Sequence, residues 1–307
     1  MPFSDQYRRQ VQLLVRMLPT VAMEDCFALK GGTAINLFVR DMPRLSVDID
    51  LTYLPVESRE DSLKAIDTAM KRIAGMAGSG SPAEDIVTGA PSAEGAVTKL
   101  FARGNGVQIK IEVTPVLRGC VFEPETRAVS PAVEDAFGFA EMKLVSFADL
   151  YGGKIVAALD RQHPRDLFDV RDLLANEGIT DDLRRAFIVY LLSHGRPMHE
   201  VIGPTRKDIS REHERGFAGM TDTPIPLEEL IAAREAMIRG IVGGMPDDHR
   251  RFLLSFERGE PEWGLLGLDH APDLPAIRWR QLNLDRLGGQ ARAKLVSDLA
   301  EKLENSQ

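Results

Sequence analysis

Two aspartates that flank an isoleucine, Asp48 and Asp50, stand in the alternating stretch SVDIDLTYL of residues 46–54. Residues two apart in a strand point to the same face, so both carboxylates are expected on one face and Ile49 and Leu51 in the core. Neighbouring carboxylates repel each other and lose solvation, and a divalent cation relieves both costs. Mg²⁺ is usually held by one or two carboxylates together with substrate phosphates. The pair therefore indicates a site for Mg²⁺ or Mn²⁺, with a harmless solvent-facing strand as the alternative.

Two glycines and a threonine precede this pair. Gly31 and Gly32 end an apolar run, residues 26–31, that predicts a short buried strand, and Thr33 is the expected N-cap of a helix over residues 33–39. Bare backbone N–H groups at the start of a helix bind phosphate oxygens, although such turns also occur for purely conformational reasons. A phosphate-binding turn followed by a metal-binding pair implies a nucleoside triphosphate (NTP) with its metal.

The remaining pattern predicts an α+β (mixed α/β) first half and a helical second half. Two alternating runs around Gly104-Asn105-Gly106 indicate a β-hairpin, and residues 75–96, rich in Gly, Ser, Pro and Ala, indicate a loop or a poorly ordered insertion. From about Ser146 the apolar residues recur at helical spacing. We therefore expect domains over residues 1–145 and 146–307. Helices are predicted over residues 5–18, 33–39, 58–74, 146–161, 163–178, 181–195, 226–240, 246–257 and 290–304.

Composition narrows the class of protein. The chain has 307 residues, 44% hydrophobic and 27% charged, which is typical of a globular protein. The sequence has no run of ~18 apolar residues, so no membrane span is expected. The N-terminal segment does not have the features of a secretory signal. The two cysteines are expected to be buried reduced thiols, so a cytoplasmic protein is expected. The net charge of −8 argues against a surface coated for nucleic-acid binding, although a local basic patch is compatible with it.

Three stretches resemble a known family. KGGTAINLF…RLSVDIDL is similar to the glycine and Asp-x-Asp signature of nucleotidyltransferases related to DNA polymerase β, and its wording resembles the AbiEii/AbiGii toxin family. DLYGGKIVAALDRQHPRDLFDVRDLL, residues 149–174, resembles that family's lysine-and-aspartate motif, and LPAIRWRQLNL is a weaker match. The resemblance implies a nucleotidyltransferase fold, with a mixed sheet, flanking helices and a helical C-terminal domain that contributes to the active site.

The same resemblance implies an activity and partners. Members are toxins of type IV toxin–antitoxin and phage-defence (abortive-infection) systems, so a cognate antitoxin encoded nearby is expected. The expected reaction is metal-dependent transfer of a nucleotidyl group from an NTP to an acceptor, which is tRNA for some relatives. In that reaction an acceptor hydroxyl attacks the α-phosphate and pyrophosphate leaves, while Gly31, Gly32 and Thr33 hold the β- and γ-phosphates.

The lysine-and-aspartate motif carries further implied roles. Lys154 matches the motif lysine, which is suited to bind NTP phosphates as a point charge. Asp169 matches the motif aspartate and would orient Lys154 or join the polar network around the reacting groups. Arg165 and Asp166 are close enough in sequence to contribute, with Asp166 ranked below Asp169 because it could cap or pair locally instead.

A third carboxylate is expected from a neighbouring strand, as polymerase-like nucleotidyltransferases have one. Glu112 is the candidate, either as general base or as ligand of a second metal; Asp169 is the other candidate base, and a solvated pair with Lys110 is the bland alternative for Glu112. Residues that could also contact the triphosphate or metal are Lys30, Arg44 and Ser46. Basic residues that could bind acceptor RNA, or could simply be solvated, are Arg161, Arg165, Arg184, Arg185, Arg206 and Lys207.

Two other functions fit parts of the pattern. A glycosyltransferase also binds metal and a sugar nucleotide through Asp-x-Asp, although the glycine turn and the later lysine motif fit it poorly. A non-catalytic relative that binds a nucleotide or a partner is the second alternative. The filled motif positions Asp48, Asp50, Lys154 and Asp169 argue against such decay.

Overall fold

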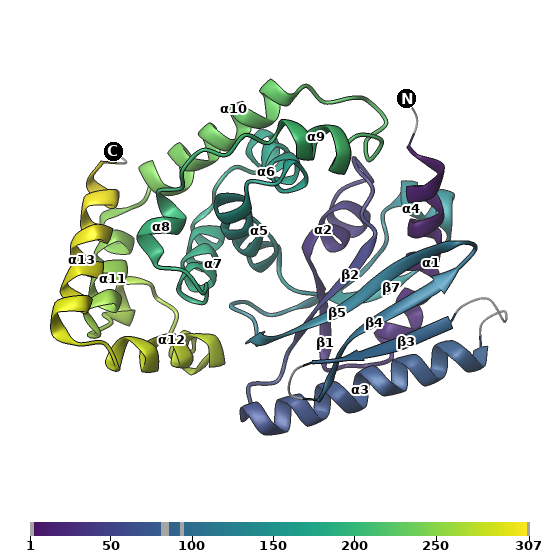
Figure 1. Cartoon of the computed structure of the whole chain (residues 1–307), viewed down its shortest axis with the longest axis horizontal. Helices are drawn as coiled ribbons and strands as arrows, with labels where there is room; N and C mark the ends of the chain where they lie inside the picture. The colour runs from purple at the N-terminus through teal and green to yellow at the C-terminus, as the bar shows by residue number, and fades with distance from the viewer. Residues whose placement is uncertain (1–2, 81–85, 93–94, 306–307) are drawn as a thin grey trace. The chain divides into compact units, whose positions relative to one another are not determined.

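The computed structural model describes residues 3–80, 86–92 and 95–305, which form two compact units (Figure 1). Unit 1 comprises Met1–Ser146 and Ala218–Pro224, and unit 2 comprises Phe147–Phe217 and Ile225–Gln307. The short segment Ala218–Pro224 therefore belongs to unit 1 although the sequence on both sides of it belongs to unit 2. Its backbone is tied there by two hydrogen bonds, from Leu45 N to the Met220 carbonyl and from Ser4 N to the Gly219 carbonyl.

Unit 1 is built on a seven-stranded mixed sheet with the order β3-β4-β5-β2-β1-β7-β6. β2 lies between β1, which is antiparallel to it, and β5, which is parallel to it. β4 and β5 form the antiparallel hairpin that the sequence predicted. The strands are β1 (Phe27–Lys30), β2 (Asp48–Tyr53), β3 (Ile86–Pro91), β4 (Val97–Gly104), β5 (Val107–Arg118), β6 (Glu125–Ala128) and β7 (Glu141–Leu144).

The sheet has an apolar face and a polar face. Helices α1 (Asp5–Ala22) and α3 (Arg59–Gly80) contact each other and the strands β3, β4, β5 and β7, and they cover the apolar face. Ile49, Leu51 and Ile111 point to this side and are fully buried. Alternation in the strands sends their neighbours, including both aspartates of β2, to the other face.

Unit 2 is helical. α5 and α7 pack closely because Gly152 has no side chain: a Cβ on it would lie 2.8 Å from the backbone N of Phe187. The helices are α5 (Phe147–Arg161), α6 (Pro164–Asn176), α7 (Asp181–Leu192), α8 (Met198–Ile202), α9 (Ser210–Gly216), α10 (Leu227–Ile238), α11 (Asp247–Arg258), α12 (Pro275–Asp285) and α13 (Gly289–Glu304).

The mixed architecture with its helical second unit confirms the predicted fold class, but the loop or insertion predicted over residues 75–96 is wrong for residues 75–80 and 86–91. α3 continues to Gly80, and Ile86–Pro91 forms strand β3 against β4. Residues 81–85 and 93–94 of that loop lie outside the described residues. The sequence also gave no sign of α4 (Pro131–Phe137) or of the short strands β6 and β7.

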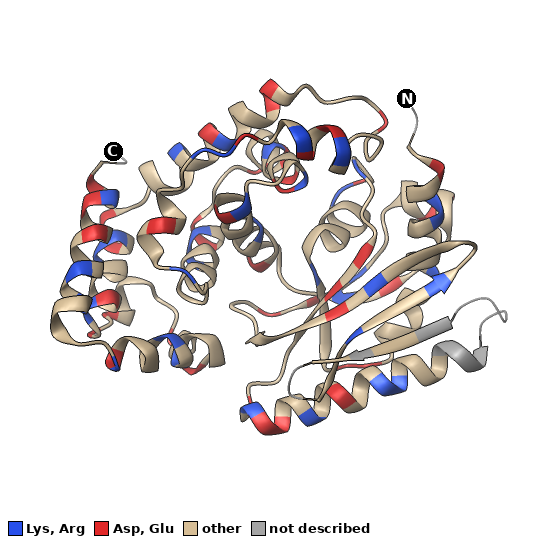
Figure 2. Ribbon diagram, in the orientation of Figure 1, with Lys and Arg blue, Asp and Glu red and all other residues tan. Residues whose placement is uncertain are grey.

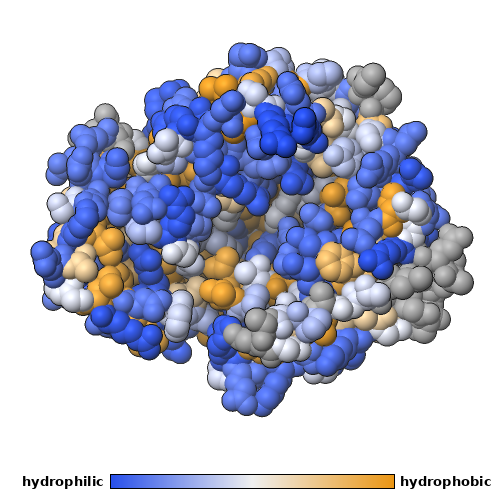
Figure 3. Space-filling model, viewed as in Figure 1, coloured by the Kyte–Doolittle hydropathy of each residue, from blue (hydrophilic) through white to orange (hydrophobic). Residues whose placement is uncertain are grey.

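The surface is largely hydrophilic in the view of Figure 3, with small separate hydrophobic areas. Large exposed apolar side chains come from different elements, among them Val56, Phe139 and Trp279. Within the described part of the chain, no helix is long and apolar enough to span a membrane.

Candidate active site

Asp48 and Asp50 lie on one face of β2, as their spacing predicted. Both side chains are partly exposed, whereas Ile49 between them and Leu51 after them are fully buried against the helices. The strand register places Lys30 of β1 directly beside Asp50. The two carboxylates are therefore accessible side by side at the start of a central strand, where a ligand can reach both.

The glycine turn lies against this pair. Gly31 has a φ of +74°, a conformation that only glycine adopts readily, and a Cβ there would lie 2.9 Å from Oδ2 of Asp50. Gly32 is confined on another side, because a Cβ would lie 2.7 Å from the guanidinium of Arg44 and 3.0 Å from Oγ of Ser46. The turn thus packs against the Asp50 carboxylate, with the buried guanidinium of Arg44 beside Gly32.

Thr33 fastens the turn to β2 and is not the N-cap that the sequence predicted. The helix α2 (Gly31–Ala34) begins two residues earlier, and Ile35–Val39 continues it as a π-helical turn. The Thr33 hydroxyl donates to the carbonyl oxygen of Asp48 at 2.5 Å and lies 3.0 Å from Oγ of Ser46, which is buried with it. Thr33 and Ser46 therefore position the turn relative to the aspartates.

Glu112 lies one strand away, paired in register with Asp50 across the parallel strands β2 and β5. Its carboxylate accepts from two lysines: Lys110 Nζ at 2.7 Å and Lys99 Nζ at 3.0 Å. Burial raises the pKa of Glu112, but the hydrogen bonds and charges of Lys110 and Lys99 outweigh it and hold that pKa below its usual range. The sequence indicated Lys110 as a neighbour and missed Lys99, which only the hairpin register reveals.

The charges of the aspartates affect the pKa values of two neighbouring lysines. Burial opposes the charge of Lys110, but its hydrogen bond to Glu112 and the charges of Asp48 and Asp50 raise its pKa overall. Burial lowers the pKa of Lys30, and the neighbouring Asp50 only partly offsets this. The Lys30 amine donates to the Thr114 hydroxyl at 3.2 Å. Lys30 and Lys110 thus flank the aspartates from the two neighbouring strands.

The aspartate pair fits a divalent cation that also binds phosphate. Among the described residues, no group of three or more His, Cys, Asp or Glu side chains is arranged to hold a metal, so the protein does not offer a complete cage. Mg²⁺ needs no such cage, because it commonly takes one or two carboxylates and completes its shell with substrate phosphates and water. Because two lysines contact Glu112, the aspartate pair fits such a cation better than Glu112 does.

Unit 2 holds a second charged cluster, the Lys154 cluster, formed by Lys154, Arg161, Asp166 and Asp169. Lys154 Nζ lies 2.9 Å from Oδ1 of Asp166 and 3.0 Å from Oδ2 of Asp169, and the three side chains are 6%, 2% and 0% exposed. Arg161 makes two further hydrogen bonds to Asp166, at 2.5 and 2.9 Å. Asp166, which the sequence ranked below Asp169, is therefore an equal partner of Lys154.

The charges of the Lys154 cluster strongly affect the pKa of Asp166. Burial raises the pKa of Asp166, but the charge of Lys154 and the contacts with Arg161 overcome this and hold the pKa far below the usual range. The spacing of Asp166 and Asp169 at i and i+3 places both on one face of α6, which is the signal that could have identified them as a pair. Arg165, in the first turn of α6, donates its backbone N–H to Nδ1 of His163.

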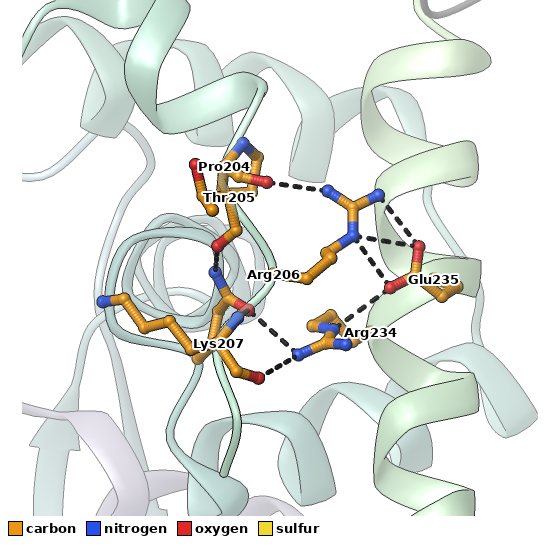
Figure 4. A network of polar contacts seen from close by, with 7 residues as sticks. Pro204, Thr205, Arg206, Lys207, Arg234 and Glu235 are labelled. Atoms are coloured by element: carbon orange, nitrogen blue, oxygen red, sulfur yellow. Dashed lines mark hydrogen bonds and ion pairs between the residues drawn. The ribbon is translucent and has the colours of Figure 1, made fainter.

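Most of the basic residues proposed for RNA binding in unit 2 have structural partners instead. The buried Arg184 donates to the carbonyl oxygens of Ile241 and Gly240. Figure 4 shows Arg206 bound by Glu235 of α10, and the same residue also donates to the Pro204 carbonyl. Beyond the figure, Arg161 pairs with Asp166, Arg185 with Asp181, and Lys207 with the carbonyl oxygen of Asp160. The sequence alone could not reveal these partners.

Comparisons with known proteins agree with the motifs. A family model described as "Nucleotidyl transferase AbiEii toxin, Type IV TA system" matches residues 12–280, which include both the aspartate pair and the Lys154 cluster. Among solved structures, the nucleotidyltransferase toxin MenT4 from Mycobacterium tuberculosis H37Rv is similar, with a TM-score of 0.62 and 14% identity over 91% of this chain and 93% of that chain. At that identity the likeness shows the fold. A comparison with curated proteins gave no match. The family match covers most of the chain and confirms the resemblance of the motifs, so the chain belongs to the AbiEii nucleotidyltransferase toxin family of type IV toxin–antitoxin systems.

Proposed function

We propose that the chain transfers a nucleotidyl group from an NTP to a hydroxyl of an acceptor, with Asp48 and Asp50 as the residues that hold a divalent cation. The observation that carries the proposal is the contact between the glycine turn and the aspartate pair, where the Gly31 Cα lies so close to Asp50 that no Cβ fits. One ligand that needs both features is a triphosphate with bound metal.

The proposed reaction is an in-line displacement at the α-phosphorus. The acceptor oxygen forms a bond to phosphorus, the bond to the bridging α–β oxygen breaks, and pyrophosphate leaves with the electron pair. Backbone N–H groups of Gly31, Gly32 and Thr33 hold the β- and γ-phosphates. Mg²⁺ or Mn²⁺, when bound to Asp48 and Asp50, supplies charge neutralisation for the phosphates. Such positioning and charge neutralisation account for most catalysis in phosphoryl transfer.

Other residues carry proposed roles from the family motifs. Lys154 has the role of the family's motif lysine, with Asp166 and Asp169 fixing its amine. Ser46 keeps Thr33 and the turn in place, and Glu112 holds Lys99 and Lys110 one strand away from Asp50. We further propose a tRNA acceptor and a cognate antitoxin that silences the activity, both of which the family suggests.

The test is transfer of a labelled nucleotide with Mg²⁺, with each NTP in turn and with total RNA as acceptor. Asp48→Asn keeps the size of the side chain and removes its charge, so transfer should fall by at least the ~10²–10³-fold typical of losing one preorganised electrostatic contact. Asp25→Asn is the matched control, because that side chain is fully exposed in the same unit. Full activity of Asp48→Asn would end the proposal.

Growth on induced expression supplies the biological readout. Wild type should arrest growth, and Asp48→Asn should not, while Asp25→Asn should behave like wild type. Transfer of a sugar from a UDP-sugar, without transfer from any NTP, would favour a glycosyltransferase. Absence of transfer from every NTP, together with unchanged toxicity of Asp48→Asn, would favour a protein that acts by binding alone.

A further inference from the structure

The polar face of the sheet continues beyond the aspartates onto β5 and β4. Register pairs define two rows across it: Asp48, Lys110 and Phe101 in the first, and Asp50, Glu112 and Lys99 in the second. Arg103 and Gln108 follow as the next pair toward the hairpin turn. The strip is defined here as Lys99, Phe101, Arg103, Gln108 and Lys110.

The strip points away from the helices of unit 1. The residues that alternate with it, such as Leu100, Ala102 and Ile109, are almost fully buried on the apolar face. Phe101 is partly exposed and Arg103 is exposed, whereas an aromatic residue in a strand normally gains by burying its ring. Figure 2 shows basic segments recurring along β4 and β5 beside the acidic ones.

The charge of the strip is positive in a chain whose net charge is −8. Lys99 and Lys110 share the single carboxylate of Glu112, at 3.0 and 2.7 Å. Arg103 donates to the neutral amide oxygen of Gln108 at 2.7 Å. The three cations of the strip therefore lie around a partly exposed aromatic ring, with Glu112 between two of them and Asp48 and Asp50 on the neighbouring strand. Positive grooves with aromatic rings on which bases stack are typical of surfaces that bind single-stranded nucleic acid.

The position of the strip fits the acceptor rather than the NTP. In-line displacement requires the attacking oxygen and the leaving pyrophosphate on opposite sides of the α-phosphorus. The glycine turn follows β1, on one side of β2, whereas β5 and β4 lie on the other side. Phe101 stands two strands from Asp48, roughly 10 Å at the usual strand spacing, which about three stacked nucleotides span at ~3.4 Å each.

We propose that the strip binds the single-stranded 3′ end of an acceptor RNA, with a base stacked on Phe101 and phosphates bound by Arg103, Lys99 and Lys110. The inference rests on the proposed nucleotidyl transfer and names the surface that delivers the attacking hydroxyl. It places the acceptor on unit 1, beside the aspartate pair.

The test is the affinity of the full chain for a short fluorescein-labelled single-stranded RNA with a free 3′ hydroxyl, measured by anisotropy without NTP. Phe101→Leu keeps the apolar bulk and removes the aromatic face, and should weaken binding about tenfold, or ~1.4 kcal/mol. Phe139→Leu is the matched control, because Phe139 is 60% exposed in the same unit and away from the strip; its affinity should equal that of wild type.

A second variant tests how much the positive charge of the strip contributes to RNA binding. Arg103→Gln should lower the slope of log affinity against log salt by about 0.7, the value for one phosphate contact with a single strand. Phe101→Leu should leave that slope unchanged, because it removes no charge. Thermal unfolding of each variant, compared with wild type, separates lost binding from lost folding.

Several results would overturn the inference: no binding of the RNA by wild type, equal affinity of Phe101→Leu and wild type, or equal loss in Phe139→Leu. An equal loss of affinity for NTP with Mg²⁺ in Phe101→Leu would place the ring under the incoming nucleotide and overturn it too. Failure of the proposed function looks different. In that case the strip variants weaken RNA binding as expected, but wild type transfers no nucleotide to any acceptor.

Discussion

Replacing Lys154 by methionine tests whether the Lys154 cluster is as important for folding as for nucleotide transfer. The structure places the amine between two carboxylates that are 2% and 0% exposed. Methionine keeps the apolar stem and removes the amine that lies between Asp166 and Asp169.

The expected loss of stability is large. Breaking a buried ion pair by removing one partner typically costs about 3–5 kcal/mol, because the other charge stays buried and uncompensated. For a domain of ~150–250 residues, 1 kcal/mol corresponds to about 2–4 °C in Tm, so the transition of unit 2 should fall by roughly 10 °C. Arg161 keeps its two hydrogen bonds to Asp166, so most of the cost falls on Asp169.

Thermal unfolding of wild type, Lys154→Met and the double variant Lys154→Met/Asp169→Asn measures this. The double variant also removes the Asp169 charge that lost its lysine, and it should regain part of the lost stability without regaining transfer activity. Lys71→Met is the matched control: its ion pair joins an exposed lysine to the partly exposed Asp67 of the same helix, and such surface pairs contribute under ~1 kcal/mol.

The pH dependence supplies a second readout. The folded-state pKa of Asp166 is depressed, so its stabilisation is present above the unfolded pKa of ~3.9 and is lost as pH falls toward the lower folded value. Removing Lys154 removes the largest favourable charge, and stability should then depend less on pH below about pH 4. Unchanged Tm in Lys154→Met, or a double variant less stable than the single one, would refute the reasoning.

Three further outcomes follow from local geometry. Gly31→Ala must hold a φ of +74° and a Cβ 2.9 Å from Oδ2 of Asp50, so urea unfolding should show a loss of about 1–2 kcal/mol, and transfer should fall with it. Gly152→Ala should lower the free energy of unfolding by about 1–3 kcal/mol, because its Cβ would lie 2.8 Å from a backbone atom. Gly153→Ala is the control and should not destabilise the protein, because its Cβ would lie 3.4 Å from a tyrosine ring. Equal stabilities of the two variants would contradict the close helix packing. Burial, and then the charge of a nearby glutamate, raise the pKa of Cys26 to about 11. Alkylation of Cys26 should therefore be slow near pH ~8 and accelerate toward pH ~11. An alkylation rate equal to that of free cysteine would be inconsistent with this environment.

The elements with a strong local period could be predicted from the sequence. The β4–β5 hairpin and the helices α5, α6 and α7 have regular apolar spacing and clear turn or cap residues. The strands β6 and β7 have four residues each and no such pattern, and they exist because they pair with each other and with β1. Their stability comes from partners far away in sequence, which a local pattern does not encode.

The candidate site likewise has features that a local sequence pattern predicts and features that depend on the whole sheet. The shared face of Asp48 and Asp50 follows from the period of a strand, and it was predicted correctly. The contact of the glycine turn with Asp50 and the pairing of Lys99 with Glu112 depend on the register between strands, which is set by the whole sheet. Thr33 was misassigned because a threonine after two glycines has the features of an N-cap, whereas its hydroxyl bonds to the neighbouring strand.

The lysines on Glu112 also bear on its chemistry. A carboxylate whose pKa lies below its usual range is a weaker general base, since proton affinity falls with pKa. Phosphoryl transfer through a loose transition state requires little proton removal before the new bond forms. Glu112 is then more useful as the anchor that holds Lys99 and Lys110 beside the aspartates, and Glu112→Gln should retain far more transfer activity than Asp48→Asn. The same variant removes the carboxylate that Lys99 and Lys110 share, so it should tighten binding of single-stranded RNA at low salt. A loss of transfer equal to that of Asp48→Asn, with unchanged RNA affinity, would instead assign Glu112 to the proton or the metal.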